Sequence, residues 1–191
     1  MSVFARFKKI LTWTIMSTTV IALTATPIAL GSEASDFGFK VEQAKIDRRL
    51  QKNKALSRQL TCLARNVFYE ANGEPFEGQL AVAQVTVNRA RSGLFPNDLC
   101  AVVTQATVIG SDEKVCQFSW YCDDQINKHR IISKNNPSYI AARKVLLEGE
   151  RVAKIDEDVF FFRRYDVYMH PSWPNKTIAK IGNHVFYKRE K

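Results

Sequence analysis

Histidine is scarce in this 191-residue chain, and the spacings that zinc sites favour are missing. The three histidines, His129, His170 and His184, stand at no recognised ligand spacing, and the four cysteines include no CxxC pair. A metallohydrolase is therefore disfavoured, and we expect neither metal nor cofactor. Repeated or compositionally simple stretches are missing as well, while 46% of the residues are hydrophobic. That combination is typical of a folded globular chain.

Charge is missing altogether from residues 10–30, a stretch of 21 residues. Arg6, Lys8 and Lys9 precede it, and the small residues of ALGSEAS follow it. This order predicts a secretory signal over residues 1–34, cleaved after Gly31 or Ala34, and hence an exported protein of the periplasm or cell wall. The alternative is an uncleaved anchor that tethers the protein to the membrane, since 21 uncharged residues could span a bilayer.

Acidic residues are fewer than basic ones, 19 against 28, which gives a formal net charge of +9. An anionic partner is therefore expected: nucleic acid, lipid head groups or an acidic wall polymer. Nucleic acid is disfavoured, because YKREK at the end of the sequence is too short for an interleaved basic and aromatic face and because the chain is expected to be exported. The basic residues 35–56 are expected to form a solvated connector between the leader and the domain.

An even number of cysteines in an oxidising compartment indicates two disulfides. Three pairings of Cys62, Cys100, Cys116 and Cys122 are open. A Cys116–Cys122 bridge closes a short loop and leaves Cys62 with Cys100, and this arrangement is favoured. Reduced, buried cysteines are the alternative if the chain is not exported.

Residues 57–191 show helical periodicity first and strand periodicity last. Apolar residues Leu60, Leu63, Ala64, Val67 and Phe68 form one stripe of a helix that stops at Asn72-Gly73, through the left-handed conformation that both residues tolerate. Three more helices are expected: from Pro75 to Ser92 with Phe76, Leu80, Ala83 and Val87 buried, over 97–105, and from Asn136 to Gly149. DVFFFRR (158–164) predicts a buried strand, and residues 176–188 predict a hairpin turning at Gly182-Asn183. The sequence thus predicts a single α+β domain with a small antiparallel sheet.

Glu70 follows Val67, Phe68 and Tyr69 in the last turn of the first helix. The helix dipole disfavours an anion there, and aromatic neighbours add desolvation, so both effects favour the protonated carboxyl. A protonated carboxyl near neutral pH is what a general acid requires. The competing interpretation is an exposed glutamate that pairs with a surface lysine or arginine.

The stretch ARNVFYEANGEPFEGQLAVAQVTVNRARSGLFPNDLCAVV (64–103) resembles the SleB-like cell wall hydrolases, the catalytic-domain family of spore-cortex-lytic enzymes. CQFSW (116–120) and IGNHVFY (181–187) are similar to later landmarks of that family, so the resemblance covers residues 57–188. It implies a lysozyme- or lytic-transglycosylase-like domain that cleaves peptidoglycan between N-acetylmuramic acid and N-acetylglucosamine. It also implies that Glu70 is the one catalytic glutamate. The sequence shows no second carboxylate obviously paired with Glu70, and Glu74 and Glu77 are the first alternatives if two are needed.

The resemblance also implies a substrate-binding set: Glu74, Tyr69, Gln117, Ser119 and Trp120. Glu74 has two interpretations, a residue that holds the substrate or the active-site loop, and a helix-start glutamate that favours the dipole. Phe118 is expected in the core, and His184 and Tyr187 are expected to build the hairpin. The chain is expected to be a monomer with peptidoglycan as its partner. The rival function is an exported protein that binds peptidoglycan without cutting it.

Overall fold

The computed structural model describes residues 32–110, 113–168 and 175–189. The chain divides into two compact units, Met1–Gln43 and Ala44–Lys191. The predicted leader, residues 1–34, lies almost wholly outside the described residues, so its fate stays a prediction. In the described ranges no helix has both the length and the apolar character that crossing a membrane requires.

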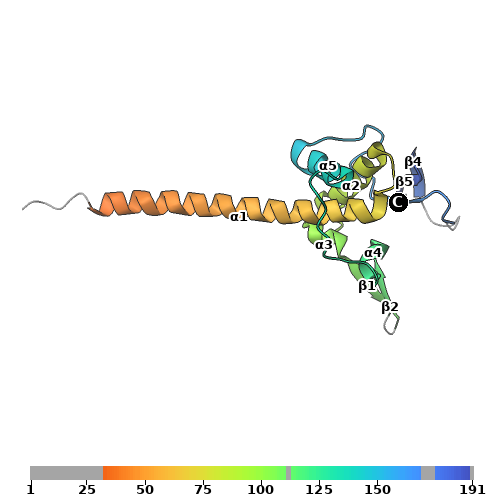
Figure 1. Ribbon diagram of the computed structural model, residues 1–191, viewed down its shortest axis with the longest axis horizontal. Coiled ribbons are helices and arrows are strands. Elements are labelled where there is room, and N and C mark those ends of the chain that lie inside the picture. Colours follow the sequence, from red (N-terminus) through yellow and green to blue (C-terminus); the bar gives the residue numbers. More distant parts are fainter. Residues whose placement is uncertain (1–31, 111–112, 169–174, 190–191) are drawn as a thin grey trace, which may run out of the picture. The chain divides into compact units, whose positions relative to one another are not determined.

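The elements follow one another in a helix-rich and then a strand-rich order (Figure 1). They are α1 Ser32–Ala71, α2 Phe76–Arg91, α3 Leu99–Val103, β1 Ala106–Ile109, β2 Glu113–Cys116, α4 Ser119–Cys122, α5 Pro137–Arg143, the π-helical turn η1 Lys144–Glu148, β3 Phe161–Arg164, β4 Asn175–Ile181 and β5 His184–Arg189. The basic segment 35–56 is helical, as part of α1. Its residues 40–56 are exposed, as a solvated segment should be.

The core forms around the end of α1 and the whole of α2. The predicted stripe of α1 is confirmed, since Leu60, Leu63, Ala64 and Val67 are buried. Residues 78–89 of α2 are all buried, which makes α2 the central helix of this unit. The prediction for Phe76 was wrong: its side chain is 39% exposed, because it stands at the very start of α2.

Polar side chains of α2 fix the segment that leads into β3. Gln84 Nε2 donates to the carbonyl of Ile155, and Asn88 Nδ2 donates to the carbonyls of Asp156, at 2.8 Å, and Val159, at 3.2 Å. These bonds satisfy backbone groups that no helix or strand would satisfy. They set where β3 begins, and β3 contributes to the candidate active site.

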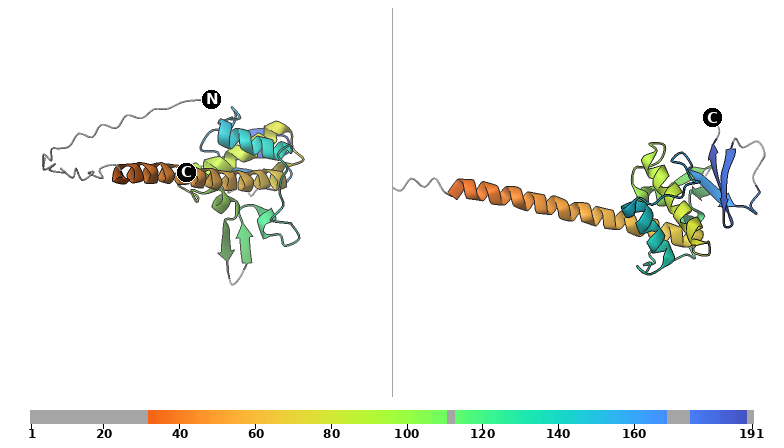
Figure 2. Two further views of the ribbon diagram at one scale, coloured as in Figure 1. Left: turned by 60° about the vertical axis from the view of Figure 1, so that its left-hand side comes forward. Right: turned by 90° about the horizontal axis from the view of Figure 1, so that it is seen from above.

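The strands form two separate antiparallel sheets. β3, β5 and β4 form a three-stranded sheet in that order, and β1 pairs with β2. Figure 2 shows the three-stranded sheet beside the helices of this unit and the β1–β2 hairpin apart from it. The predicted turn at Gly182-Asn183 is confirmed, with Ile181 paired to His184 and Gly182 at φ +57°.

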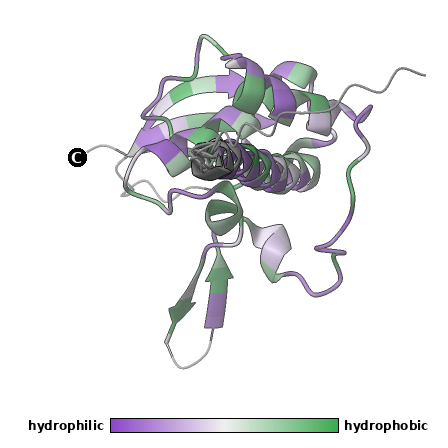
Figure 3. Ribbon diagram, turned by 90° about the vertical axis from the view of Figure 1, so that its left-hand side faces the viewer, coloured by the Kyte–Doolittle hydropathy of each residue, from purple (hydrophilic) through white to green (hydrophobic). Residues whose placement is uncertain are grey.

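One further local prediction differs from the structure, and two features of the structure were not predicted. α1 ends at Ala71 without a left-handed glycine at 73, since the described glycines with positive φ are Gly93, Gly110, Gly149 and Gly182. The β1–β2 hairpin and α4 had not been predicted. The hairpin carries exposed apolar residues at Val108, Ile109 and Val115, so its strands lack the one-sided burial that makes a strand recognisable in a sequence. Figure 3 shows hydrophobic segments in both of its strands.

Candidate active site

A groove of about 770 Å³ opens over the end of α1. It gathers side chains from α1, α4, β3 and β5 and from the loops that follow α4 and β3. Its lining residues are Tyr69, Glu70, Ser119, Trp120, Cys122, Asp123, Ile126, Phe162, Arg163, Arg164, Val167 and His184. Of the residues predicted for the site, the groove therefore brings together Glu70, Tyr69, Ser119 and Trp120.

Glu70 occupies the last turn of α1 and is partly buried. Burial raises the pKa of its carboxyl from 4.5 to about 7, and the positive charge of Arg89 opposes part of the rise. A carboxyl with a pKa near 7 is populated in both protonation states near neutral pH. Such a group can give a proton and take one back within a single reaction.

Arg89, on α2, is a candidate site residue that the sequence did not lead us to predict, and its charge acts on Glu70. Its guanidinium carbon lies 5.3, 4.9 and 5.7 Å from the ring centroids of Phe95, Phe118 and Phe161, and its Nε donates to the carbonyl of Phe160 at 2.7 Å. Nη1 is buried and has no hydrogen-bond partner among the residues that the structure describes. Burial lowers the pKa of the guanidinium to about 10, which leaves it charged at neutral pH.

The charge of Arg89 thus acts on Glu70 from a fixed position, since three rings and one carbonyl hold the side chain. The sequence did contain a signal. An arginine among the apolar residues of a buried helix is unusual, because an arginine is almost never buried unless it is paired.

Tyr69 and Trp120 form the aromatic wall of the groove. Their rings stack with centroids 4.7 Å apart and planes at 28°. Trp120 Nε1 donates to Asn66 Oδ1 at 2.9 Å, and the Tyr69 hydroxyl donates to the carbonyl of Asn127 at 2.6 Å. Both polar ends are therefore satisfied within the protein. Trp120 is buried and packs against the half-buried ring of Tyr69, which offers the apolar surface.

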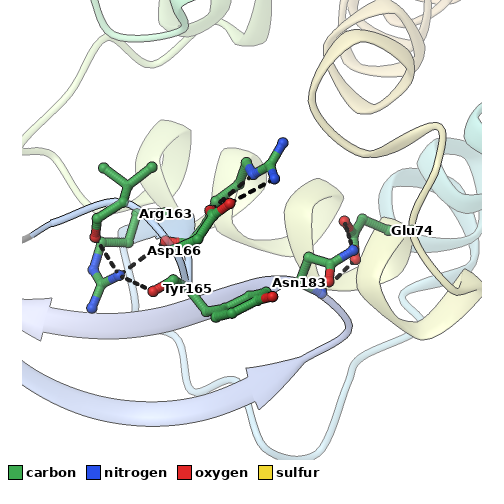
Figure 4. A network of polar contacts seen from close by, with 7 residues as sticks. Glu74, Arg163, Tyr165, Asp166 and Asn183 are labelled. Atoms are coloured by element: carbon green, nitrogen blue, oxygen red, sulfur yellow. Dashed lines mark hydrogen bonds and ion pairs between the residues drawn. The ribbon is translucent and has the colours of Figure 1, made fainter.

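Two of the predicted substrate-binding residues lie outside the groove. Gln117 is exposed, and its backbone N–H donates to the carbonyl of Gln105 at 2.9 Å. Glu74 turns toward the β4–β5 turn (Figure 4), where its carboxylate accepts from the backbone N–H of Asn183 at 2.8 Å and from Asn183 Nδ2 at 3.2 Å. A Cβ on Gly182 would lie 2.1 Å from Glu74 Oε2, so only glycine fits there.

Two arginines line the groove, and Nε of Arg163 is buried without a hydrogen-bond partner among the residues that the structure describes. Arg163 Nη1 donates to the carbonyls of Arg164, Tyr165 and Val167, and Arg164 forms an ion pair with Asp166 (Figure 4). They hold the turn after β3 in place.

Asp123 is the other carboxylate among the groove-lining residues that the structure describes. It is exposed, and one oxygen accepts from the backbone N–H of Gln125 at 2.8 Å. Glu77, which the sequence made a candidate second acid, is exposed on α2 outside the groove. Asp123 is therefore the residue to test for a two-carboxylate mechanism.

Two disulfides support the site. The structure joins Cys116 to Cys122 and Cys62 to Cys100, the pairing that the sequence favoured. The first bridge ties the end of β2 to α4, which carries Ser119 and Trp120. In the described ranges no group of three histidine, cysteine, aspartate or glutamate side chains is placed to hold a metal ion.

Comparison with known proteins identifies relatives of this arrangement. The family described as Cell Wall Hydrolase matches residues 73–187. The spore cortex-lytic enzyme of Bacillus subtilis (strain 168) is 31% identical over 125 residues, which are 65% of this chain and 35% of that protein. The chain thus spans about a third of the length of this curated relative.

Two solved structures resemble the fold. The catalytic domain of the Bacillus cereus SleB protein matches with a TM-score of 0.54 at 26% identity, over 69% of this chain and 91% of that one. The catalytic domain of the germination-specific lytic transglycosylase SleB from Bacillus anthracis matches with a TM-score of 0.51 at 26% identity, over 68% of this chain and 93% of that one. These matches confirm the predicted α+β, lysozyme-like fold class.

Proposed function

This chain belongs to the cell wall hydrolase family, and we propose that it cleaves the glycan strands of peptidoglycan as a lytic transglycosylase. The names of its relatives support this proposal, since one similar domain is a lytic transglycosylase and one similar protein is a cortex-lytic enzyme. The observation that carries it is Glu70, a carboxyl with a pKa of about 7 in a groove with an aromatic wall.

The proposed reaction needs one acid and no water. Protonated Glu70 gives its proton to the oxygen between N-acetylmuramic acid and N-acetylglucosamine, and the bond from that oxygen to the muramic C1 breaks. The C1 centre becomes oxocarbenium-like, and the sugar's own 6-hydroxyl oxygen bonds to it. Ionised Glu70 takes the hydroxyl proton, which restores the acid and leaves a 1,6-anhydro ring.

Arg89 assists the reaction at the stage between the two proton transfers, when Glu70 carries a negative charge. A fixed cation that lies close by without forming a direct ion pair stabilises the carboxylate while leaving its oxygens free to accept the returning proton. The pKa of Glu70 is thereby kept near neutrality, although burial alone would raise it further.

The sugar rings are proposed to lie along Tyr69 and Trp120, with Ser119 at the mouth of the groove. Aromatic rings suit the apolar faces of pyranoses, and the half-buried ring of Tyr69 offers such a surface beside Glu70. Gln117 reaches the substrate only if the glycan strand extends beyond the groove. Export by residues 1–34 would deliver the enzyme, proposed to act as a monomer, to the cell wall.

The test compares Glu70→Gln with Asp123→Asn, two isosteric changes of the carboxylates that line the groove. We expect Glu70→Gln to lower the rate of peptidoglycan cleavage by about 10²–10⁴-fold, because it removes the transferable proton. Asp123→Asn should leave most activity. Mass spectrometry should find 1,6-anhydro ends, lighter by one water than reducing ends.

Each contrary outcome identifies a different error. Equal losses in the two variants together with reducing muramic ends would indicate a two-carboxylate hydrolase. An active Glu70→Gln enzyme would refute Glu70 as the acid. Wild-type protein that leaves no cleared band in a peptidoglycan gel would indicate a binding protein without activity.

The folding of Glu70→Gln provides the control. Because the folded-state pKa of Glu70 lies above its ordinary value, the folded wild type holds the proton to higher pH than the unfolded chain does. Wild-type stability therefore falls as the pH rises from 4.5 to about 7. Glutamine does not titrate, so the variant should be at least as stable as the wild type at pH 8.

A further inference from the structure

We propose that His184 is a substrate-binding residue of the groove and that Glu74 positions it through the β4–β5 turn. The inference rests on the proposed function for the identity of the ligand, a strand of N-acetylated sugars. It assigns a different role to each of the two glutamates in residues 66–74 (NVFYEANGE). Glu70 carries the chemistry, and Glu74, four residues later, holds the strand that completes the opposite wall.

The first step is the attachment of the turn to the helical part. Both oxygens of Glu74 accept hydrogen bonds from Asn183, one from its backbone and one from its side chain. Gly182 passes so close to this carboxylate that no Cβ would fit. On its other side the turn is bound to the loop after β3, since the backbone N–H of Tyr165 donates to the carbonyl of Asn183 at 2.8 Å. The turn is therefore fixed from two directions.

The second step is that the fixed turn leads directly into His184. This residue is the first of β5 and pairs with Ile181 across one edge and with Arg164 across the other. Its ring contacts Phe162 edge to face, with centroids 5.2 Å apart. The position of the imidazole in the groove thus depends on where Asn183 is held.

The third step is that the imidazole has hydrogen-bonding capacity that the protein does not use. His184 lines the groove with Glu70 and is only 4% exposed. Its Nδ1 has no hydrogen-bond partner among the described residues. Burial lowers the pKa of the ring, while Glu74 raises it and Arg164 lowers it, so the ring is neutral at pH 7. A neutral imidazole has one donor and one acceptor, which suits a sugar hydroxyl or an N-acetyl group.

The decisive experiment is a double-mutant cycle on the full chain with purified peptidoglycan as substrate. His184→Phe keeps a ring of similar size among Phe162 and Phe186 and removes both nitrogens. Glu74→Ala removes both bonds to the turn. Each single variant should raise KM about tenfold with kcat much less affected, and the double variant should match His184→Phe alone.

Two further variants keep this test decisive. Glu74→Gln retains one acceptor oxygen for the turn and should lie between the wild type and Glu74→Ala. Glu77→Ala removes an exposed carboxylate from the start of α2 and should change nothing. Multiplying effects, about a hundredfold in the double variant, would overturn the coupling of Glu74 to His184. An unchanged KM in His184→Phe would overturn its role in binding.

A readout without catalysis separates this proposal from the proposed function. The ¹⁵N resonances of the His184 ring, identified by their loss in His184→Phe, should shift in Glu74→Ala but not in Glu77→Ala. They should also shift when chitotetraose is titrated onto the wild type. If the wild type cleaves no peptidoglycan, the proposed function is wrong, while sugar binding by His184 and its positioning by Glu74 can still be tested by these resonances. An unmoved ring in Glu74→Ala overturns positioning, and an unmoved ring on titration overturns binding.

Discussion

Two carboxyl groups, one in the last turn of α1 and one in the link from α1 to α2, differ in what surrounds them. Glu70 is partly buried beneath an aromatic wall and senses one fixed cation, whereas Glu74 accepts two hydrogen bonds from a turn 109 residues away in sequence. Burial without a partner favours the protonated form of Glu70, whereas both oxygens of Glu74 are engaged by the turn. The same residue type is therefore suited to acid catalysis at position 70 and to holding a turn at position 74.

At this scale the pH profile is the direct test of Glu70 and Arg89. The wild-type kcat should fall as the pH rises through about 7, because the acid must begin protonated. Arg89→Met removes the cation that lowers the pKa of Glu70. The pH at which kcat falls should therefore rise by on the order of one pH unit. Arg89→Lys retains the charge and serves as the control. A fall of kcat at an unchanged pH in Arg89→Met would show that this cation does not act on Glu70.

At the scale of elements, the two disulfides support different properties. Cys62–Cys100 joins α1 to α3 across 38 residues, whereas Cys116–Cys122 closes a loop of 6 and fastens α4 beside the groove. The entropy that a bridge removes from the unfolded chain grows with loop length. The long bridge should therefore matter more for stability and the short one more for substrate binding.

Replacing each pair with serines tests this division. Cys62→Ser with Cys100→Ser should lower the free energy of unfolding by about 4 kcal/mol, and Cys116→Ser with Cys122→Ser by about 2 kcal/mol. The second pair should nevertheless raise KM more, because α4 carries Ser119 and Trp120. Urea unfolding and peptidoglycan kinetics measure the two effects. The reverse order in either measurement would contradict the assignment.

Elements that are encoded by residues close together in the sequence could be predicted, and elements that depend on distant residues could not. The stripe of α1, the start of α5 at Asn136-Pro137 and the turn at Gly182-Asn183 are encoded by neighbouring residues, and all three were predicted. The β1–β2 hairpin was missed because it is exposed and is tied to α4 by a disulfide. Within the site, the protonated state of Glu70 could be inferred from its neighbours in the helix, whereas the aromatic wall was expected from the family resemblance. The contacts of Arg89 with Phe118 and Phe161 and of Glu74 with Asn183 could not be inferred, since these partners lie far along the chain.

At the scale of the whole molecule, every groove-lining residue belongs to the unit Ala44–Lys191. The described side chains from residue 40 to residue 58 are exposed, and most of their charges are basic. Among the side chains of α1 whose burial the structure describes, Leu60 is the first buried apolar one, at 7% exposure. The limit of the folded unit is therefore set by burial, and it need not coincide with either end of α1.

A truncation series locates that limit. Chains that begin at Ala44 or at Ser57 should keep the thermal midpoint and the cleavage rate of the full chain, because the residues removed contribute no described buried side chain. A chain that begins at Thr61 loses Leu60 and the ion pair of Arg58 with Asp98. Removing a buried leucine side chain costs about 2–4 kcal/mol, whereas an exposed ion pair adds little. Its thermal midpoint should therefore fall by roughly 5–10 °C in calorimetry. A comparable fall in the chain that begins at Ser57 would show that the exposed part of α1 stabilises the domain, and the limit would then lie before residue 57.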